Sequence, residues 1–205
     1  MTPVIFFESI SIPLPRKEIY RRLGFIKGVT EISSSQKEEI ERFIQDALSL
    51  IHLKGAGLRI PVQEIKGARI ILAEDVTFES NQLAALLRNC REIVLMGATA
   101  GNDIMKAIEE DAAGRNVTRG IVFDATASET VDASLDWIMG YFNRTLLREN
   151  RQLLKKRYSA GYGDLLLETQ NTIYRLLQLD RIGIRITESC ILIPEKSVTA
   201  ITGIR

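Results

Sequence analysis

The segment RYSAGYGDLLLETQ, residues 157–170, gathers the side chains of this sequence that are best suited to binding chemistry. Its first eight residues include one arginine, two tyrosines, two glycines and one aspartate. Either glycine can adopt the left-handed backbone conformation that ends a helix, which is the simplest explanation of the composition. A helix end does not account for Arg157, Tyr162 or Asp164. We therefore treat the segment as a candidate functional loop.

Composition narrows the possible functions. The 205 residues carry a formal net charge of +1, which indicates neither a nucleic-acid-binding surface nor an acidic tail. The single histidine, His52, follows an amphipathic helix in a segment without a nucleophile-elbow motif, so a Ser-His-Asp triad is not expected. Cys90 and Cys190 have no second cysteine at metal-binding spacing, which disfavours a disulfide framework and a zinc site. We expect two buried thiols, no metal site and no evident catalytic residue.

The N-terminal segment MTPVIFFESISIPLP is typical of a strand rather than a signal peptide. It has no basic flank before its apolar run, and an acid and prolines interrupt it. We therefore expect a cytoplasmic protein that does not contact a membrane.

Hydrophobic periodicity up to residue 90 predicts alternating helices and strands. Ser35 and Glu38 have capping-box spacing before a run whose apolar residues recur on one helical face. Ser80 is placed to cap a later helix. The predicted elements are a short helix over 16–23 ended by Gly24, a long helix that begins near Ser35, strands over 57–65 and 69–79, and a helix after Ser80.

The next stretch predicts a strand, a glycine turn, a helix and, in GIVFDA, a second strand. Gly97 and Gly101 could let backbone amides approach a ligand, and Asp124 stands about where a ribose-binding acid would lie in a dinucleotide fold. However, the spacing GATAG is not GxGxxG, and helical periodicity from about residue 126 replaces the further strands of a Rossmann domain. We favour a structural turn.

The C-terminal region predicts a helix in LLLETQNTIYRLLQL and then an antiparallel hairpin. GIRITESCILIP and KSVTAITGI both alternate at period two, and Pro194 and Glu195 separate them. In this pattern Glu188 faces the same way as Ile186 and Cys190. A carboxylate on an apolar face needs a partner or a ligand, whereas one at a solvated edge needs neither. Both possibilities stay open for Glu188.

These C-terminal motifs together resemble the activation domain of cobalamin-dependent methionine synthase, the module that binds S-adenosylmethionine. The resemblance is carried by RYSAGYGD as an R-x-x-x-G-Y motif, the helix after it, and TESCILIPEKSVTAITGI as a TES segment followed by P-x-x-S-V. IVLMGATAG and the long helix also fit, particularly the free-standing members of that family. The resemblance extends over about residues 18–205, and its motifs lie after residue 90.

The resemblance implies a reactivation function. Such domains hold S-adenosylmethionine over the corrin when the synthase's cobalamin has been oxidised to cob(II)alamin, while a flavodoxin-type donor supplies an electron. The implied cofactors are S-adenosylmethionine and a cobalamin carried by the partner, a cobalamin-binding methionine synthase. A module that positions a reactive methyl group needs little acid-base chemistry, which suits this sequence. We expect a reactivation module or subunit of a methyltransferase and not a complete enzyme.

The family motif implies that Arg157, Ala160, Gly161 and Tyr162 contact the ligand. S-adenosylmethionine presents a carboxylate, an ammonium, a sulfonium and a flat adenine, so its site needs a guanidinium, a carboxylate, open backbone amides and an aromatic wall. Arg157 suits the ligand carboxylate, and Tyr162 suits the ligand or the corrin. Asp164 and Glu188 are our own additions as the acidic contacts.

The expected fold is α+β, with a twisted, mostly antiparallel sheet and helices packed around it, in a single domain over residues 1–205. Two other functions stay open: an activator of a different corrinoid methyltransferase, and a ligand-binding module with no reactivation role. A self-contained methyltransferase is disfavoured, because no glycine-rich loop follows the first strand. A corrinoid-binding domain is disfavoured as well, because His52 does not stand in a D-x-H-x-x-G motif.

Overall fold

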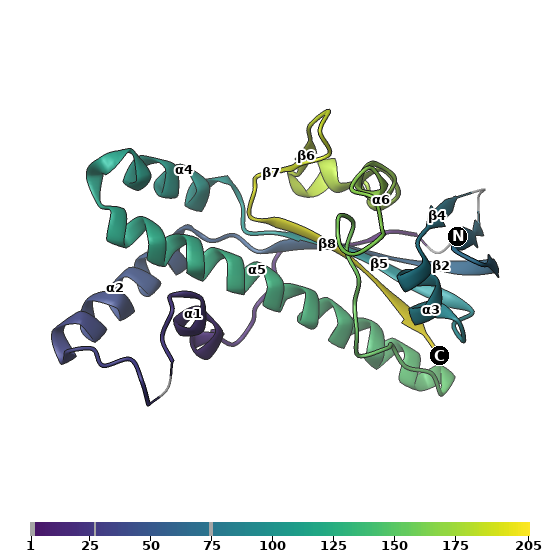
Figure 1. The fold of residues 1–205 in the computed structure, drawn as a ribbon, viewed down its shortest axis with the longest axis horizontal. Coiled ribbons are helices and arrows are strands. Elements are labelled where there is room, and N and C mark those ends of the chain that lie inside the picture. The colour runs from purple at the N-terminus through teal and green to yellow at the C-terminus, as the bar shows by residue number, and fades with distance from the viewer. Residues whose placement is uncertain (1–2, 27, 74–75) are drawn as a thin grey trace.

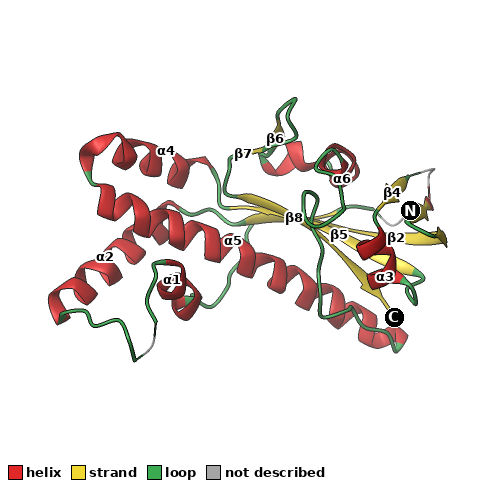
Figure 2. Ribbon diagram, in the orientation of Figure 1, coloured by secondary structure: helices red, strands yellow, loops and turns green. Residues whose placement is uncertain are grey.

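A computed structural model describes residues 3–26, 28–73 and 76–205. It shows an elongated molecule in which helices cover a curved sheet (Figures 1 and 2). The elements are β1 (Ile5–Phe7), α1 (Arg16–Arg22), α2 (Ser34–Leu50), β2 (Lys54–Lys66), β3 (Arg69–Leu72), β4 (Thr77–Glu79), α3 (Asn81–Leu87), β5 (Glu92–Thr99), α4 (Asn102–Glu110), α5 (Val117–Leu146), α6 (Thr169–Leu177), β6 (Arg185–Ile186), β7 (Leu192–Ile193) and β8 (Ser197–Ile204).

Among the described residues, six strands form the main sheet. Five have the order β4-β3-β2-β5-β8, and β1 pairs with the first part of β2 on the edge opposite β5. Every pair is antiparallel. The predicted α+β class and antiparallel sheet are therefore confirmed. The long strand β2 joins the two halves of the sheet, because it pairs with β5 along its first part and with β3 after Pro61.

Both faces of the sheet are buried. Along β5, Val94 and Met96 belong to the core beneath α5, whereas Ile93 and Leu95 belong to the core that α3 and α6 cover. Figure 1 shows the same division, with the long α5 on one side of the sheet and α6 and the β6–β7 hairpin on the other. Successive side chains of a strand point to opposite faces, so a strand covered on both faces becomes an almost continuous apolar run.

The predicted strand GIVFDA is wrong, because these residues lie in α5. The helix begins at Val117, where the Asn116 side chain accepts a hydrogen bond from the Arg119 amide at 3.1 Å. Gly120 fits closely against Asp111, since an added Cβ would lie 3.0 Å from the Asp111 Cβ. A short apolar run has no periodicity that separates a buried helix from a buried strand.

The helix starts are otherwise close to those predicted. The capping box of α2 is formed by Ser33 and Gln36, two residues before the predicted pair Ser35 and Glu38. The Gln36 amide donates to Ser33 Oγ at 3.2 Å, and the Ser33 amide donates to Gln36 Oε1 at 2.9 Å. Ser80 caps α3 as predicted, through a hydrogen bond from the Leu83 amide at 2.9 Å.

The predicted C-terminal hairpin is wrong in its pairing. The segment GIRITESCILIP folds back on itself, with β6 paired to β7 around a turn at TESC. The turn is held by local hydrogen bonds, because Thr187 Oγ1 accepts from the Ile191 amide at 3.0 Å and Thr187 O accepts from the Cys190 amide at 2.9 Å. Strand β8 instead pairs with β5 over its whole length.

The segment before the candidate loop lies along the outer edge of β8. Leu154 donates its amide to Gly203 O at 2.8 Å, and Tyr158 and Ile201 exchange two backbone hydrogen bonds of 2.8 and 2.7 Å. The chain leaves this edge at Tyr158 and enters the loop. The loop is therefore attached to the main sheet immediately beside Arg157.

Asp164 attaches the other end of the loop to α3. Its carboxylate accepts hydrogen bonds from Ser80 Oγ at 2.5 Å and from the Asn81 amide at 2.7 Å. These bonds lower the pKa of Asp164, first through Ser80. A carboxylate at a helix N-terminus satisfies amides that have no partner within the helix. We therefore assign Asp164 to holding the loop in place.

Gly57 lets β2 lie close to a side chain of α5. A Cβ at this position would lie 2.5 Å from Cε2 of Phe142, inside the ring's contact distance. We expect Gly57→Ala to lower the free energy of unfolding by about 1–3 kcal/mol, because the core is already filled. Urea denaturation measures this. Gly140→Ala at a half-buried position of α5, where the nearest atom to the added Cβ is Arg144 Nη1 at 3.6 Å, should instead raise the free energy of unfolding by about 0.5–1 kcal/mol. Equal effects from the two substitutions would contradict this packing.

Asp164→Asn should destabilise the protein at neutral pH, because it removes the charge that accepts from the start of α3. The pKa of Asp164 is lowered from 3.8 by folding, so its stabilising effect is complete above that value and disappears as the pH falls below it. Urea midpoints of the wild type and the variant should therefore differ at pH 7 and converge below pH 3.8. Glu168→Gln, which neutralises an exposed acid in the same segment, is the control and should change the midpoint little at pH 7. A pH-independent gap would contradict the assignment.

Candidate ligand-binding site

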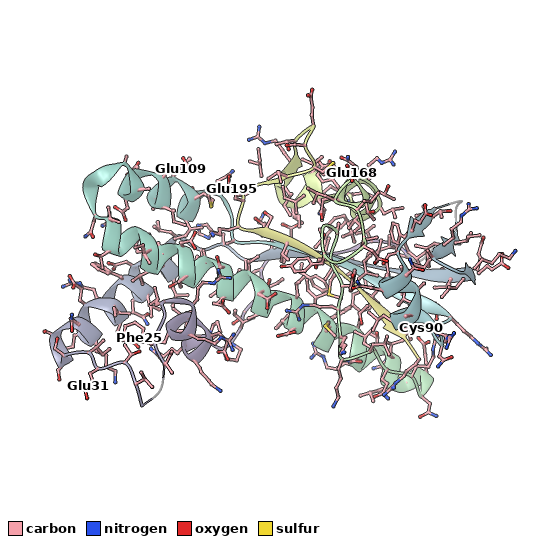
Figure 3. The ribbon with its side chains drawn as sticks, viewed as in Figure 1. Phe25, Glu31, Cys90, Glu109, Glu168 and Glu195 are labelled. Atoms are coloured by element: carbon pink, nitrogen blue, oxygen red, sulfur yellow. The ribbon has the colours of Figure 1, made fainter. Side chains whose placement is uncertain are left out.

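A cavity of about 660 Å³ lies between the candidate loop, α5, β7 and β8. This volume falls within the range of about 300–1,000 Å³ that is usual for small-molecule sites. Its walls combine a charged pair from the loop and α5 with apolar side chains such as Leu135 and Leu192. Figure 3 shows Glu195, another residue of the wall, where the chain enters β8.

The cavity contains three of the six residues proposed from the sequence. Arg157, Ala160 and Tyr162 line it. Gly161 shapes the loop between them. Asp164 and Glu188 are not in the cavity wall, since the first is bound to the start of α3 and the second is exposed at the β6–β7 turn.

Arg157 forms ion pairs with two carboxylates of α5. Nη2 lies 2.7 Å from Asp132 Oδ2, and Nη1 is hydrogen-bonded to Asp136. Burial lowers the pKa of Arg157, but the bond and charge of Asp132 and the charge of Asp136 outweigh it, so the pKa is above its ordinary value. Two hydrogen bonds leave further N–H donors of the guanidinium for a ligand. The side chain is thus a fixed positive charge in the cavity wall.

The two loop glycines are required by the backbone. Gly161 has φ of +82° and Gly163 has φ of +55°, both in the left-handed region. A Cβ on Gly163 would also lie 2.2 Å from Tyr158 Oη. Contrary to the expectation of an open amide, the N–H of Gly161 donates to Leu165 O at 2.9 Å. The positive φ of Gly161 makes the turn that places Tyr162.

Tyr162 stands at the mouth of the cavity. It is 70% exposed, and Ile191, which also lines the cavity, is 45% exposed. Leu166 is an exposed neighbour in the loop. Large apolar side chains that gather beside a cavity mouth are characteristic of a surface that meets a ligand or a partner.

Sequence reasoning missed the acidic residues of the cavity. Asp132 and Glu195 line it, whereas the predicted Glu188 does not, because the turn at TESC breaks the period-two pattern on which that prediction rested. Asp132 stands one turn before Asp136 on α5, and nothing in the sequence connects this pair to Arg157. Glu195 lies inside the P-x-x-S-V motif, which was a signal that could have identified it.

Sequence reasoning also missed a polar group in the cavity wall. Gln170, in the first turn of α6, and Thr199, in β8, both line the cavity and are buried. They are hydrogen-bonded to each other at 3.0 Å. The TQN sequence at the start of α6 looked like an ordinary helix start, so the pattern gave no signal.

The described residues contain neither a cluster of metal-binding side chains nor a helix suited to a membrane. No group of three or more histidine, cysteine or acidic side chains in that part of the chain is arranged to hold a metal ion. None of the described helices combines the length and apolar character needed to span a bilayer.

Comparisons with known proteins give a match in structure and none in sequence. No family model matches the chain, and no curated protein matches it. Among solved structures, the chain is similar to one described as the crystal structure of the MetH reactivation domain bound to AdoHcy, with a TM-score of 0.68 and 16% identity. The similarity covers 98% of this chain and 78% of that one. The chain therefore has the fold of the MetH reactivation domain.

Proposed function

We propose that this protein binds S-adenosylmethionine and its product S-adenosylhomocysteine in the cavity beside Arg157. The observation that carries the proposal is that the R-x-x-x-G-Y loop forms one wall of a ligand-sized cavity in a fold shared with a domain described as bound to AdoHcy. The proposed contacts are Arg157, Ala160 and Tyr162, with Gly161 shaping the loop. Asp164 acts by fixing the loop, and Glu188 has no position in the cavity wall.

The charges of the cavity suit the amino-acid part of such a ligand. A free α-amino acid group carries a carboxylate beside an ammonium. Arg157 offers a guanidinium to the carboxylate, and Asp132 or Glu195 offers a carboxylate to the ammonium. The apolar wall and the exposed ring of Tyr162 suit the flat base and the methyl group.

The proposed role is the reactivation of a cobalamin-dependent methionine synthase in the cytoplasm. The partner would carry the cobalamin, and a flavodoxin-type donor would reduce cob(II)alamin by one electron. Methyl transfer from the sulfonium to the partner's reduced cofactor would leave the C–S electron pair on sulfur, which gives S-adenosylhomocysteine. This protein's residues hold the methyl donor in orientation and shield it from water, which is catalysis by positioning. The exposed side chains around the cavity mouth supply a surface for the partner.

The first test of this function is ligand binding. We expect wild-type protein to bind S-adenosylhomocysteine in isothermal titration calorimetry, and Arg157→Ala to weaken binding by about 2–5 kcal/mol, the usual cost of removing one partner of a hydrogen-bonded charge pair. Arg157→Lys should recover only part of the affinity, because an ammonium lacks the planar pair of donors.

Arg175→Ala is the matched control for that test. Arg175 is an exposed arginine of α6 outside the cavity wall, so its removal takes the same charge from the protein and should leave the affinity close to that of the wild type. Absence of binding by the wild type at millimolar ligand would reject the proposed function. Binding that Arg157→Ala leaves unchanged would remove Arg157 from the site.

The second test is reactivation itself. Added to oxidised methionine synthase with S-adenosylmethionine and a one-electron donor, the protein should restore methylcobalamin, followed by absorption spectroscopy. Tyr162→Ala should slow the recovery, while Tyr162→Phe should keep it, because the ring rather than the hydroxyl covers the mouth. Leu147→Ala, which truncates an exposed apolar side chain after α5, is the control. If methylcobalamin recovers at an equal rate without the protein, the protein is a ligand-binding module with no reactivation role. If recovery occurs only with another corrinoid methyltransferase, that enzyme is the partner.

A further inference from the structure

The side-chain amide of Gln170 is buried, and only one of its two polar atoms has a hydrogen-bond partner among the described residues. It is 5% exposed and lines the ligand cavity from the first turn of α6. Its Oε1 accepts a hydrogen bond from Thr199 Oγ1 at 3.0 Å. Its Nε2 is buried and has no hydrogen-bond partner among the described residues. If the two atoms of the amide exchanged places, Thr199 would still satisfy only one of them.

An unsatisfied buried polar group is costly. Native proteins seldom leave such a donor unpaired, and a ligand, an ion or a bound water usually pairs it. Gln170 is held by Thr199, which is itself buried in β8, and Ser159 Oγ of the loop donates to Thr199 O at 2.8 Å. The amide is therefore connected to both the sheet and the loop. The side chain that carries this unpaired donor lines the cavity.

The chemistry of Gln170 differs from that of the charged wall. Arg157 and Asp132 form an ion pair, and they suit the charged amino-acid group of the ligand. Gln170 is neutral, and its hydrogen-bonded partner Thr199 is also neutral. A neutral buried donor matches a neutral acceptor. S-adenosylmethionine and S-adenosylhomocysteine have such acceptors in the adenosine part, as ring nitrogens and ribose oxygens.

We propose that Gln170 Nε2 donates a hydrogen bond to one acceptor of the ligand's adenosine, so that Gln170 is a specificity-determining residue and Thr199 its positioning residue. The inference rests on the proposed binding function and adds to it how the nucleoside is recognised. A site built to hydrogen-bond a ligand atom discriminates strongly against an analogue that lacks that atom, because the protein group is then left unpaired.

The experiment measures dissociation constants for S-adenosylhomocysteine by calorimetry. Gln170→Met keeps the length of the side chain and removes the donor, and it should weaken binding about 10-fold, the value of one neutral hydrogen bond. Its melting temperature without ligand is measured as well, because the substitution removes the unsatisfied Nε2 but leaves the Thr199 hydroxyl without its acceptor. The double variant Gln170→Met/Thr199→Val lacks both groups, so it should bind as weakly as Gln170→Met and melt at a higher temperature than that single variant. Gln170→Glu keeps an acceptor for Thr199 but replaces the donor with a second acceptor, and it should bind at least as weakly as Gln170→Met. Thr199→Val should weaken binding less than Gln170→Met does. In the Gln170→Met background it should cause no further loss of affinity.

Ligand analogues identify the acceptor. S-adenosylhomocysteine is altered at one adenosine acceptor at a time, with a ring nitrogen replaced by CH or a ribose oxygen removed. The analogue that lacks the recognised atom should bind the wild type about 10-fold more weakly, yet bind Gln170→Met no more weakly than unaltered ligand does. The inference would be overturned if every analogue weakened binding to Gln170→Met by the same factor as it weakened binding to the wild type. So would equal affinity of the wild type, Gln170→Met and Gln170→Glu, with the binding function intact. A wild type that binds no S-adenosylhomocysteine would reject the function and this inference together.

Discussion

Backbone hydrogen bonds between residues 152–158 and the outer edge of β8 determine where the candidate site lies. An edge strand presents unpaired amides and carbonyls, and proteins cover such edges with another segment of chain. Here the covering segment ends at Tyr158, whose amide and carbonyl pair with Ile201 at 2.8 and 2.7 Å. The R-x-x-x-G-Y loop must therefore begin at the sheet edge. One wall of the cavity and the position of Arg157 follow from this pairing.

The opposite wall depends on α5, which crosses the face of the sheet. Gly57 lets Phe142 of α5 approach β2, and Asp132 and Asp136 then meet Arg157. Both carboxylates are largely exposed, so these ion pairs contribute little to stability. Their consequence is geometric. They hold the guanidinium against α5 and place an acidic and a basic group side by side in the cavity wall.

Much of the fold could be predicted from the sequence, because local patterns determine helices and buried strands. The face of α2, the cap at Ser80 and the apolar run of β5 are examples. Pairing between distant strands leaves no local signal, so the sequence pattern predicts a hairpin for β8, whereas this strand extends the main sheet beside β5. The same limit applies to the site. The loop could be recognised from its own residues, whereas Asp132 and Gln170 reach the cavity only through tertiary packing.

The backbone of the candidate site is already held in place, whereas one of its polar side chains still lacks a hydrogen-bond partner. The loop's own hydrogen bonds are made, since Gly161 donates to Leu165 and Asp164 accepts from the start of α3. A ligand that enters the cavity therefore need not order the loop, and the entropy cost of binding is reduced. The buried amide of Gln170, in contrast, lacks one partner among the described residues, although the same packing fixes its orientation. We therefore expect a few fixed polar groups to recognise the ligand, without closure of the loop over it. The residues that such a closure would move are already bound to the sheet, to α3 and to α5.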